Sequence, residues 1–301
     1  MVDKVLDDRL IGTAAVAYSN GTTIPVAKIE GGPTYKAEMR RLLLETLEPD
    51  QESTIFVTIY FTLLSCLRFL NLVEQSVKIS PLKGMLSALK VSTEVFLEED
   101  IQSVEIALPA TKSYSTKGNP QTQYLDDVLN SIGLARTNEH PARSSLATIY
   151  ANNITSLPST GKLLPSFILH LSYSCSALII TLENLEVGLL EITKTTARLD
   201  LGADSIRSYP HYWRAVESEM KSFLTGITVR DVVVSGDRVW EEAEVSILMR
   251  RVLGKKVVPG RSLGRRGGGV DPVWAGVLGV ATMAISEDFE DGEIGIWGIG
   301  S

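Results

Sequence analysis

The chain has 301 residues, 44% hydrophobic and 22% charged, which is enough for a sizeable core in one bilobed unit or two small domains. A formal net charge of −7 and an isoelectric point near 5.2 argue against a nucleic-acid-binding surface, because such a surface needs a basic face. The 2 cysteines and 3 histidines show no metal-ligand spacing. We interpret the cysteines as buried thiols in a reducing compartment.

The apolar stretch at residues 54–73 raises the question of a membrane span. It has no charge before Arg68, but this uncharged run is shorter than the roughly 20 residues that a spanning helix needs. We interpret the stretch as part of a buried helix and expect no membrane partner. The first ten residues are acidic and lack the apolar core of a secretory signal, so we expect a cytoplasmic protein.

The first half of the chain opens with a hairpin signal. Residues 12–30 contain two apolar runs separated by Asn20-Gly21, a dipeptide typical of tight hairpin turns. In chain order, the expected elements that follow are helices at 35–48, 55–77 and 82–97, a strand at 101–109, a helix at 123–132, a strand at 134–137 and a helix at 141–150. In the longer strand, Val104, Ile106 and Leu108 alternate on one face.

The second half begins near Thr155 with a strand meander. In chain order, the expected elements are strands at 166–172, 177–182 and 189–196, a helix at 209–224, a strand at 231–234, a helix at 241–253, a strand at 257–258, a Gly/Arg loop at 261–269 and a helix at 272–284. Each half thus holds strands followed by helix–strand–helix units, and we predict an α/β fold.

The start of the last helix carries the clearest motif. Asp271-Pro272 is followed by Ala275, Gly279 and Ala281, an order that matches a DPxxAxxxGAA pattern without a gap. An aspartate cap before a proline at the first helical position is favourable in any helix. The alternative interpretation is therefore an ordinary Asp-Pro-initiated helix.

Three earlier segments contribute further motifs. The buried strand at 231–234 leads into Ser235-Gly236-Asp237-Arg238, and Leu201-Gly202-Ala203-Asp204 follows the meander. Asn138-Glu139-His140-Pro141 precedes the helix at 141–150 and is similar to a NEPTAAAIAYG pattern with one inserted residue.

In this order, the motifs resemble the ATPase domain of the seventy-kilodalton heat-shock chaperones, within the actin and sugar-kinase superfamily. The resemblance is greatest to the shortened chaperone-like proteins of filamentous fungi. It implies an actin-like (ribonuclease H-like) bilobed ATPase fold, with lobes at residues 1–154 and 155–285 and an acidic flexible tail at 286–301.

The resemblance also implies roles for single residues. Gly202, Gly236, Asp271 and Gly279 would contribute to binding ATP or ADP with magnesium. Glu139 would be the catalytic carboxylate that positions the attacking water through magnesium. A second interpretation of Glu139, as an acid favoured by the dipole of the helix that follows, stays open.

Departures from the family pattern fall on the phosphate loops. The family's DLGGGT loop corresponds to His170-Leu171-Ser172-Tyr173-Ser174-Cys175, which has no glycine, and a tyrosine within that turn should obstruct a phosphate. The first loop, GIDLGTT in the family, finds no glycine turn at residues 7–12. Residues 205–230 leave room for one helix where the family has a helical subdomain that grips the adenosine, so this subdomain is expected to be reduced or missing.

These departures favour a non-catalytic binding or scaffolding protein, a pseudo-ATPase with protein partners. A weak ATP-binding protein or ATPase that uses Glu139, Gly202 and Gly236 is the alternative from the enzyme class. A third hypothesis is an incomplete product that folds poorly, because loss of a subdomain exposes surface that relatives bury.

Overall fold

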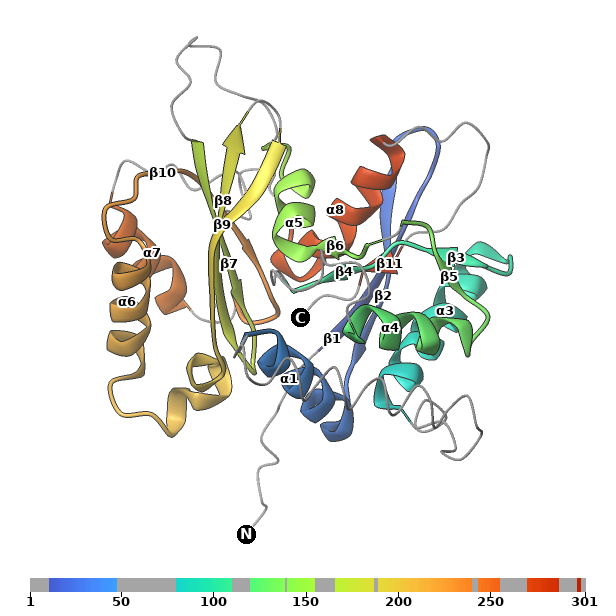
Figure 1. Cartoon of the computed structure of the whole chain (residues 1–301), viewed down its shortest axis with the longest axis horizontal. Coiled ribbons are helices and arrows are strands. Elements are labelled where there is room, and N and C mark those ends of the chain that lie inside the picture. Colours follow the sequence, from blue (N-terminus) through green and yellow to red (C-terminus); the bar gives the residue numbers. More distant parts are fainter. Residues whose placement is uncertain are drawn as a thin grey trace.

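The computed structural model describes residues 11–47, 80–109, 120–138, 140–154, 166–186, 189–239, 243–254, 270–286 and 297–298. It is an α/β structure with two main sheets, which Figure 1 shows side by side with helices between and outside them. The expected helix at 55–77, strand at 257–258 and loop at 261–269 lie outside the described residues.

The first part of the chain builds one sheet and the helices beside it. Its elements are β1 (Ile11–Ala17), β2 (Thr23–Glu30), α1 (Pro33–Leu47), α3 (Pro81–Leu97), β3 (Ser103–Val104), β4 (Ala107–Leu108), α4 (Pro120–Asn130), β5 (Ala135–Arg136), β6 (Ala142–Arg143) and α5 (Ser144–Ala151). The expected helices at 35–48, 82–97 and 123–132 are confirmed as α1, α3 and α4, with small shifts of their ends.

The predicted hairpin is confirmed as the antiparallel pair β1 and β2. Gly21 has a φ of 85° at the turn, and its N–H donates to the carbonyl of Tyr18 at 2.9 Å. The side chain of Asn20 accepts the Thr22 N–H at 2.9 Å, so the Asn-Gly pair supplies both the left-handed residue and a side-chain acceptor. On the other edge of β1, β11 (Trp297–Gly298) completes the first sheet in antiparallel orientation, although the sequence predicts a tail there.

The strand expected at 101–109 is wrong as one continuous element. It is divided into β3 and β4, which pair in parallel with the two different strands β5 and β6. Pro141, which has no N–H to donate to a neighbouring strand, lies between β5 and β6. The helix expected from residue 141 therefore starts only at Ser144, because Ala142 pairs with β4 through a 2.7 Å bond from its N–H to the Ile106 carbonyl.

The second part builds the larger sheet. Its elements are β7 (Ser166–Tyr173), β8 (Leu178–Glu186), β9 (Leu189–Arg198), two 3₁₀ turns, η3 (Leu199–Leu201) and η4 (Ala203–Arg207), α6 (Tyr212–Phe223), β10 (Val229–Ser235), α7 (Ala243–Leu253) and α8 (Pro272–Ser286). The strand order is β10-β7-β8-β9, with β10 parallel to β7 and the other pairs antiparallel. The expected meander is confirmed. The helix expected from residue 209 starts at Tyr212, after His211 in a left-handed conformation with a φ of 61°.

Helices cover both faces of this second sheet. Leu169 and Leu171 of β7 pack with the buried side chains of α6 and α7, whereas Ile168 packs with Ile149 of α5 on the opposite face. Because side chains alternate along a strand, His170 shares the face of Ile168. That face therefore combines apolar residues with a buried histidine.

Helices α5 and α8 lie between the two sheets (Figure 1). They contact each other closely, and α8 also contacts β1 and β10 while α5 contacts β7 and β8. Small and apolar side chains fill this layer, among them Ala15 of β1, Ala147 of α5 and Val277 of α8. The pair of helices thus joins the two sheets through one packed layer.

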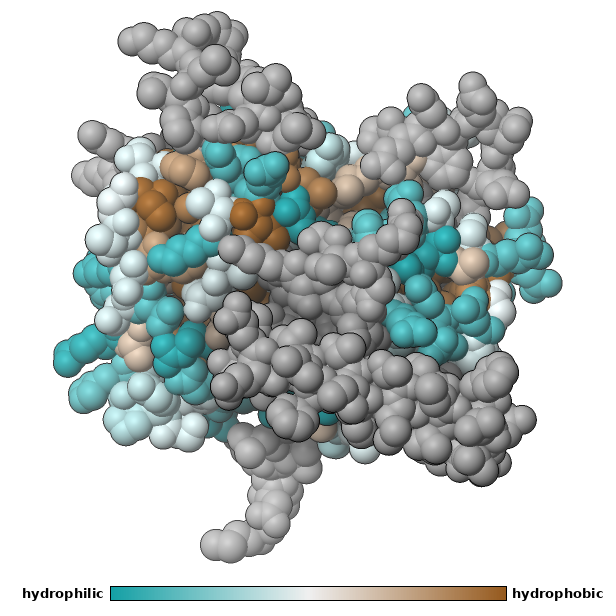
Figure 2. Space-filling model, viewed as in Figure 1, coloured by the Kyte–Doolittle hydropathy of each residue, from teal (hydrophilic) through white to brown (hydrophobic). Residues whose placement is uncertain are grey.

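The visible surface is mixed in character. Figure 2 shows hydrophobic and hydrophilic residues interspersed over the coloured part of this face. Within the described ranges, none of the helices combines the length and the apolar character needed to cross a bilayer.

Candidate functional site

The carboxyl ends of the two parallel strands, β7 and β10, define the candidate site. In open α/β sheets, ligands bind outside these strand ends. Ser235 at the end of β10 is in register with Ser172 near the end of β7. The segment after β7 turns back into β8, and the segment after β10 contains Gly236, Asp237 and Arg238.

Gly236 brings the segment after β10 against the end of β7. Its φ of 112° favours glycine, and a Cβ there would lie 2.1 Å from the carbonyl oxygen of Tyr173. Its own N–H donates to the Pro272 carbonyl at 3.2 Å, so the same turn also holds the first residue of α8. The glycine is thus required by contacts within the protein.

Gly202 packs on the turn between β7 and β8. A Cβ on Gly202 would lie 2.4 Å from the carbonyl oxygen of Cys175. The next two N–H groups bond the same turn: Ala203 donates to the Ser174 carbonyl, and Asp204 donates to the Cys175 carbonyl, both at 3.0 Å. The segment from Gly202 to Asp204 is therefore held by the backbone of this turn.

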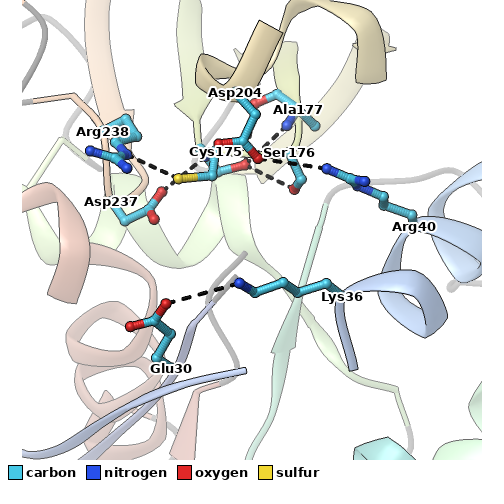
Figure 3. A network of polar contacts seen from close by, with 10 residues as sticks. Glu30, Lys36, Arg40, Cys175, Ser176, Ala177, Asp204, Asp237 and Arg238 are labelled. Carbon is cyan, nitrogen blue, oxygen red and sulfur yellow. Dashed lines mark hydrogen bonds and ion pairs between the residues drawn. The ribbon is translucent and has the colours of Figure 1, made fainter. Parts of the chain in front are cut away.

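The carboxylate of Asp237 lies beside Cys175, in the turn that follows β7 (Figure 3). The residue is 7% exposed, and its Oδ1 accepts the backbone N–H of Cys175 at 3.3 Å. Burial raises the pKa of Asp237, and its Oδ2 has no hydrogen-bond partner among the described residues. Beside it, Nε of Arg238 lies 2.9 Å from Sγ of the buried Cys175.

Helix α1 lies beside this cluster, and its Arg40 side chain reaches toward Asp204 (Figure 3). Arg40 Nη2 lies 3.7 Å from Asp204 Oδ2, which is an ion pair between α1 and the turn η4. One turn earlier on α1, the buried Lys36 has its Nζ 3.9 Å from Oε1 of Glu30 at the end of β2. Arg40 thus links α1 to a loop of the second sheet, whereas Lys36 pairs within the first part of the chain (Figure 3).

His170 lies on β7 behind the turn. Its Nε2 and the hydroxyl of Ser235 are 2.8 Å apart, which joins β7 to β10. Burial lowers the pKa of His170 from 6.5 to about 3. The side chain is therefore a neutral imidazole near neutral pH, where the family pattern has a charged aspartate.

Tyr173 does not stand where the sequence led us to expect it. The prediction that its ring obstructs the turn is wrong, because the ring packs beneath α6 on the face opposite His170. Its hydroxyl lies 3.1 Å from that of Tyr212. The side chain that contacts the backbone of the turn is instead Asp237, which accepts the Cys175 N–H.

One buried cluster was not predicted from the sequence. Glu183 of β8 is fully buried, and Ser145 of α5 donates to its Oε1 at 2.5 Å. Nη2 of Arg143, the last residue of β6, lies 3.5 Å from its Oε2. Burial raises the pKa of Glu183, and the charge of Arg143 opposes that rise. No clear signal for this link was visible in the sequence, because β8 also carries the polar residues Thr181, Asn184 and Glu186.

Of the four residues predicted to bind the nucleotide, three lie near one another and one lies apart. Gly202 and Gly236 meet at the turn after β7, and Asp271 adjoins them because Gly236 bonds Pro272. Asp271 caps α8, with its Oδ1 accepting the Val273 N–H at 3.1 Å. Gly279 lies further along α8 against α5, where a Cβ would be 1.7 Å from the Ala147 carbonyl oxygen.

The predicted catalytic residue, Glu139, lies outside the described residues. Within the part of the chain that the structure describes, no three or more His, Cys, Asp or Glu side chains gather where they could hold a metal ion.

Comparison with known families and with curated proteins found no family model and no curated protein that matches this chain.

Proposed function

We propose that this protein is a non-catalytic binding or scaffolding protein built on a reduced actin-like fold of the heat-shock-chaperone type. The observation that carries the proposal is the buried Asp237 carboxylate, which accepts the Cys175 N–H at 3.3 Å at the carboxyl end of β7. This is the loop in which the resemblance would place the nucleotide's phosphates.

The arrangement of the second part supports the proposed fold. The resemblance implies a strand meander followed by a helix, a strand and a further helix, and the chain has β7-β8-β9, α6, β10 and α7 in that order. The two helices that carry the NEPTAAAIAYG-like and DPxxAxxxGAA-like motifs, α5 and α8, pack against each other through Ala147 and Gly279.

The chemistry of the loops supports the loss of phosphate binding. A phosphate needs free backbone N–H donors and a positive surrounding. Here the N–H groups of Cys175, Ala203 and Asp204 donate to groups of the protein itself. When ionised, the Asp237 carboxylate would also repel a phosphate at close range. These bonds and this charge support the proposal that the site does not take a magnesium nucleotide.

The retained glycines do not argue against this proposal. Gly202, Gly236 and Gly279 each approach a backbone carbonyl at a distance that leaves no room for a Cβ. These positions need glycine for packing, whether or not a nucleotide is bound. The two glycines near the strand ends are the best support for the alternative of weak ATP binding, and internal packing supplies a sufficient reason for them.

Magnesium-dependent ATP hydrolysis tests the proposal. We expect phosphate release by the purified chain to stay at the level of a no-protein blank, and Glu139→Ala to give the same value. Activity that Glu139→Ala leaves unchanged would be assigned to a contaminating ATPase. Activity that is lost both in Glu139→Ala and on removal of magnesium would overturn the proposal.

A substitution at Gly236 is a poor probe of the alternative. Its positive φ and the 2.1 Å approach to Tyr173 mean that any side chain there would disturb the fold before it could report on a ligand. Direct binding to the unmodified chain is therefore the cleaner measurement of nucleotide affinity.

A further inference from the structure

Helix α3 presents an apolar outer face. Val91 and Val95 are 57% and 73% exposed, and they are two of the large hydrophobic residues that the described part of the chain exposes. The opposite face of α3 is buried in the core of the first part through residues such as Met85 and Leu89. The outer face is therefore a second apolar surface on a helix whose inner face is already packed.

Small residues continue this outer face toward the start of the helix. Gly84, Ala88, Val91 and Val95 are spaced by four, three and four residues, which places them on one side of a helix. We call this set the α3 face. A Cβ on Gly84 would meet nothing within 4 Å, so the protein's own packing gives no reason for a glycine inside this helix, unlike Gly279 of α8. Small side chains do allow another helix to approach closely.

The charges along α3 are self-complementary. Lys83 and Lys90 lie in its first two-thirds, whereas Glu94 lies in its last turn and Glu98, Glu99 and Asp100 follow it. Lys83, Lys90 and Glu94 share one flank of the α3 face, and Lys90 Nζ already lies 3.4 Å from Glu94 Oε1. An antiparallel second copy of the helix would bring the basic part of each copy against the acidic end of the other.

We propose that the α3 face is the interface of a homodimer in which two α3 helices pack antiparallel about a twofold axis. In such an isologous contact, Lys83 of one copy faces Glu94 of the second copy, and the axis passes between the levels of Ala88 and Leu89. The antiparallel helix dipoles also attract each other. An interface only one helix wide is small, so the dimer is weak. This inference does not rest on the proposed loss of nucleotide binding.

Sedimentation equilibrium of the full chain tests the dimer. We expect concentration-dependent self-association, with a dissociation constant that rises about tenfold or more in Val91→Gln. Ile247→Gln is the matched control, because Ile247 is a β-branched residue of α7 with a similar exposure of 54%. A protein that stays monomeric up to about 100 μM, or a dimer that both variants weaken equally, would overturn the proposal.

Cysteine cross-linking tests the orientation of the helices. In Ala88→Cys, the new thiols of the two copies lie next to each other near the twofold axis. We therefore expect a disulfide-linked dimer under mild oxidation. In Val95→Cys, the two thiols lie about 20 Å apart along the antiparallel helices, so we expect no cross-link above that of the wild type. Cross-linking of Val95→Cys but not of Ala88→Cys would show that the antiparallel arrangement is wrong.

Discussion

Three buried ionisable side chains make the stability of the fold depend on pH: His170 and Glu183 in the second sheet, and Asp237 in the segment after β10. His170 is 1% exposed and neutral, while Glu183 and Asp237 have pKa values that burial raises. Each of these groups binds protons differently in the folded and unfolded chain, so each makes the free energy of unfolding depend on pH.

For His170, the direction of this dependence follows from its lowered pKa. The unfolded side chain takes up a proton below about 6.5, but the folded one only near pH 3. The unfolded chain therefore binds more protons in this window, and this contribution lowers stability as the pH falls, by up to about 1.4 kcal/mol per pH unit.

We predict that His170→Gln has a shallower loss of stability between pH 6.5 and pH 4 than the wild type. Urea unfolding at several pH values measures this difference. Glu183 and Asp237 act in the opposite sense, because a raised carboxyl pKa favours the folded state on acidification, but they are present in both proteins and cancel in the comparison. Equal slopes in the two proteins would contradict a buried, neutral His170.

Single residues were predicted from the sequence unevenly. The charge that Asp237 brings to the motif after β10 was visible in the sequence, but its bond to Cys175 joins residues 62 positions apart and depends on the pairing of β7 with β10. The cap at Asp271 could be read from Asp-Pro alone because capping is local. Roles that depend on long-range contacts needed the structure.

At the scale of elements, the packing of α5 on α8 joins the two sheets. The helices approach so closely at Gly279 that a Cβ would lie 1.7 Å from the Ala147 carbonyl oxygen. Gly276, about one turn earlier on α8, has nothing within 4 Å of a Cβ position. Gly279 is therefore needed for the close approach of α5 and α8, whereas Gly276 is not.

We predict opposite effects for alanine at these two positions. Gly279→Ala should lower the free energy of unfolding by about 1 to 3 kcal/mol, because the helices must separate. Gly276→Ala should raise it by about 0.5 to 1 kcal/mol, because alanine favours the helix. Chemical denaturation of both variants measures the effects. A similar change in both would mean that the close contact at Gly279 does not govern the helix pair.

The elements themselves differ in how far local pattern determined them. The hairpin of β1 and β2 follows from Asn20-Gly21, and the alternation of β7 and β8 was readable because both strands are long. The division of β3 from β4 was not readable, because it depends on where β5 and β6 lie. Such short parallel strands carry little periodicity of their own.

At the scale of the whole molecule, helices α5 and α8 connect two sheets. At the ends of β7 and β10, Asp237 bonds the Cys175 N–H and Arg40 of α1 pairs with Asp204. The sequence predicted the α/β class and the order of the second half. It did not predict that β11 would return to the first sheet, because two residues give no pattern on their own.

Titration of the purified chain with Mg-ATP and Mg-ADP, followed by thermal unfolding, tests the central proposal most directly. A ligand at 100 times its dissociation constant stabilises a fold by about 2.7 kcal/mol, which is a rise of roughly 5 °C in Tm for a chain of this size. We predict a cooperative transition whose Tm does not change with either nucleotide, because the backbone N–H groups of the loops already donate to Asp237 and to backbone carbonyls. A saturable rise of that size would contradict the account and would mean that the nucleotide site is functional.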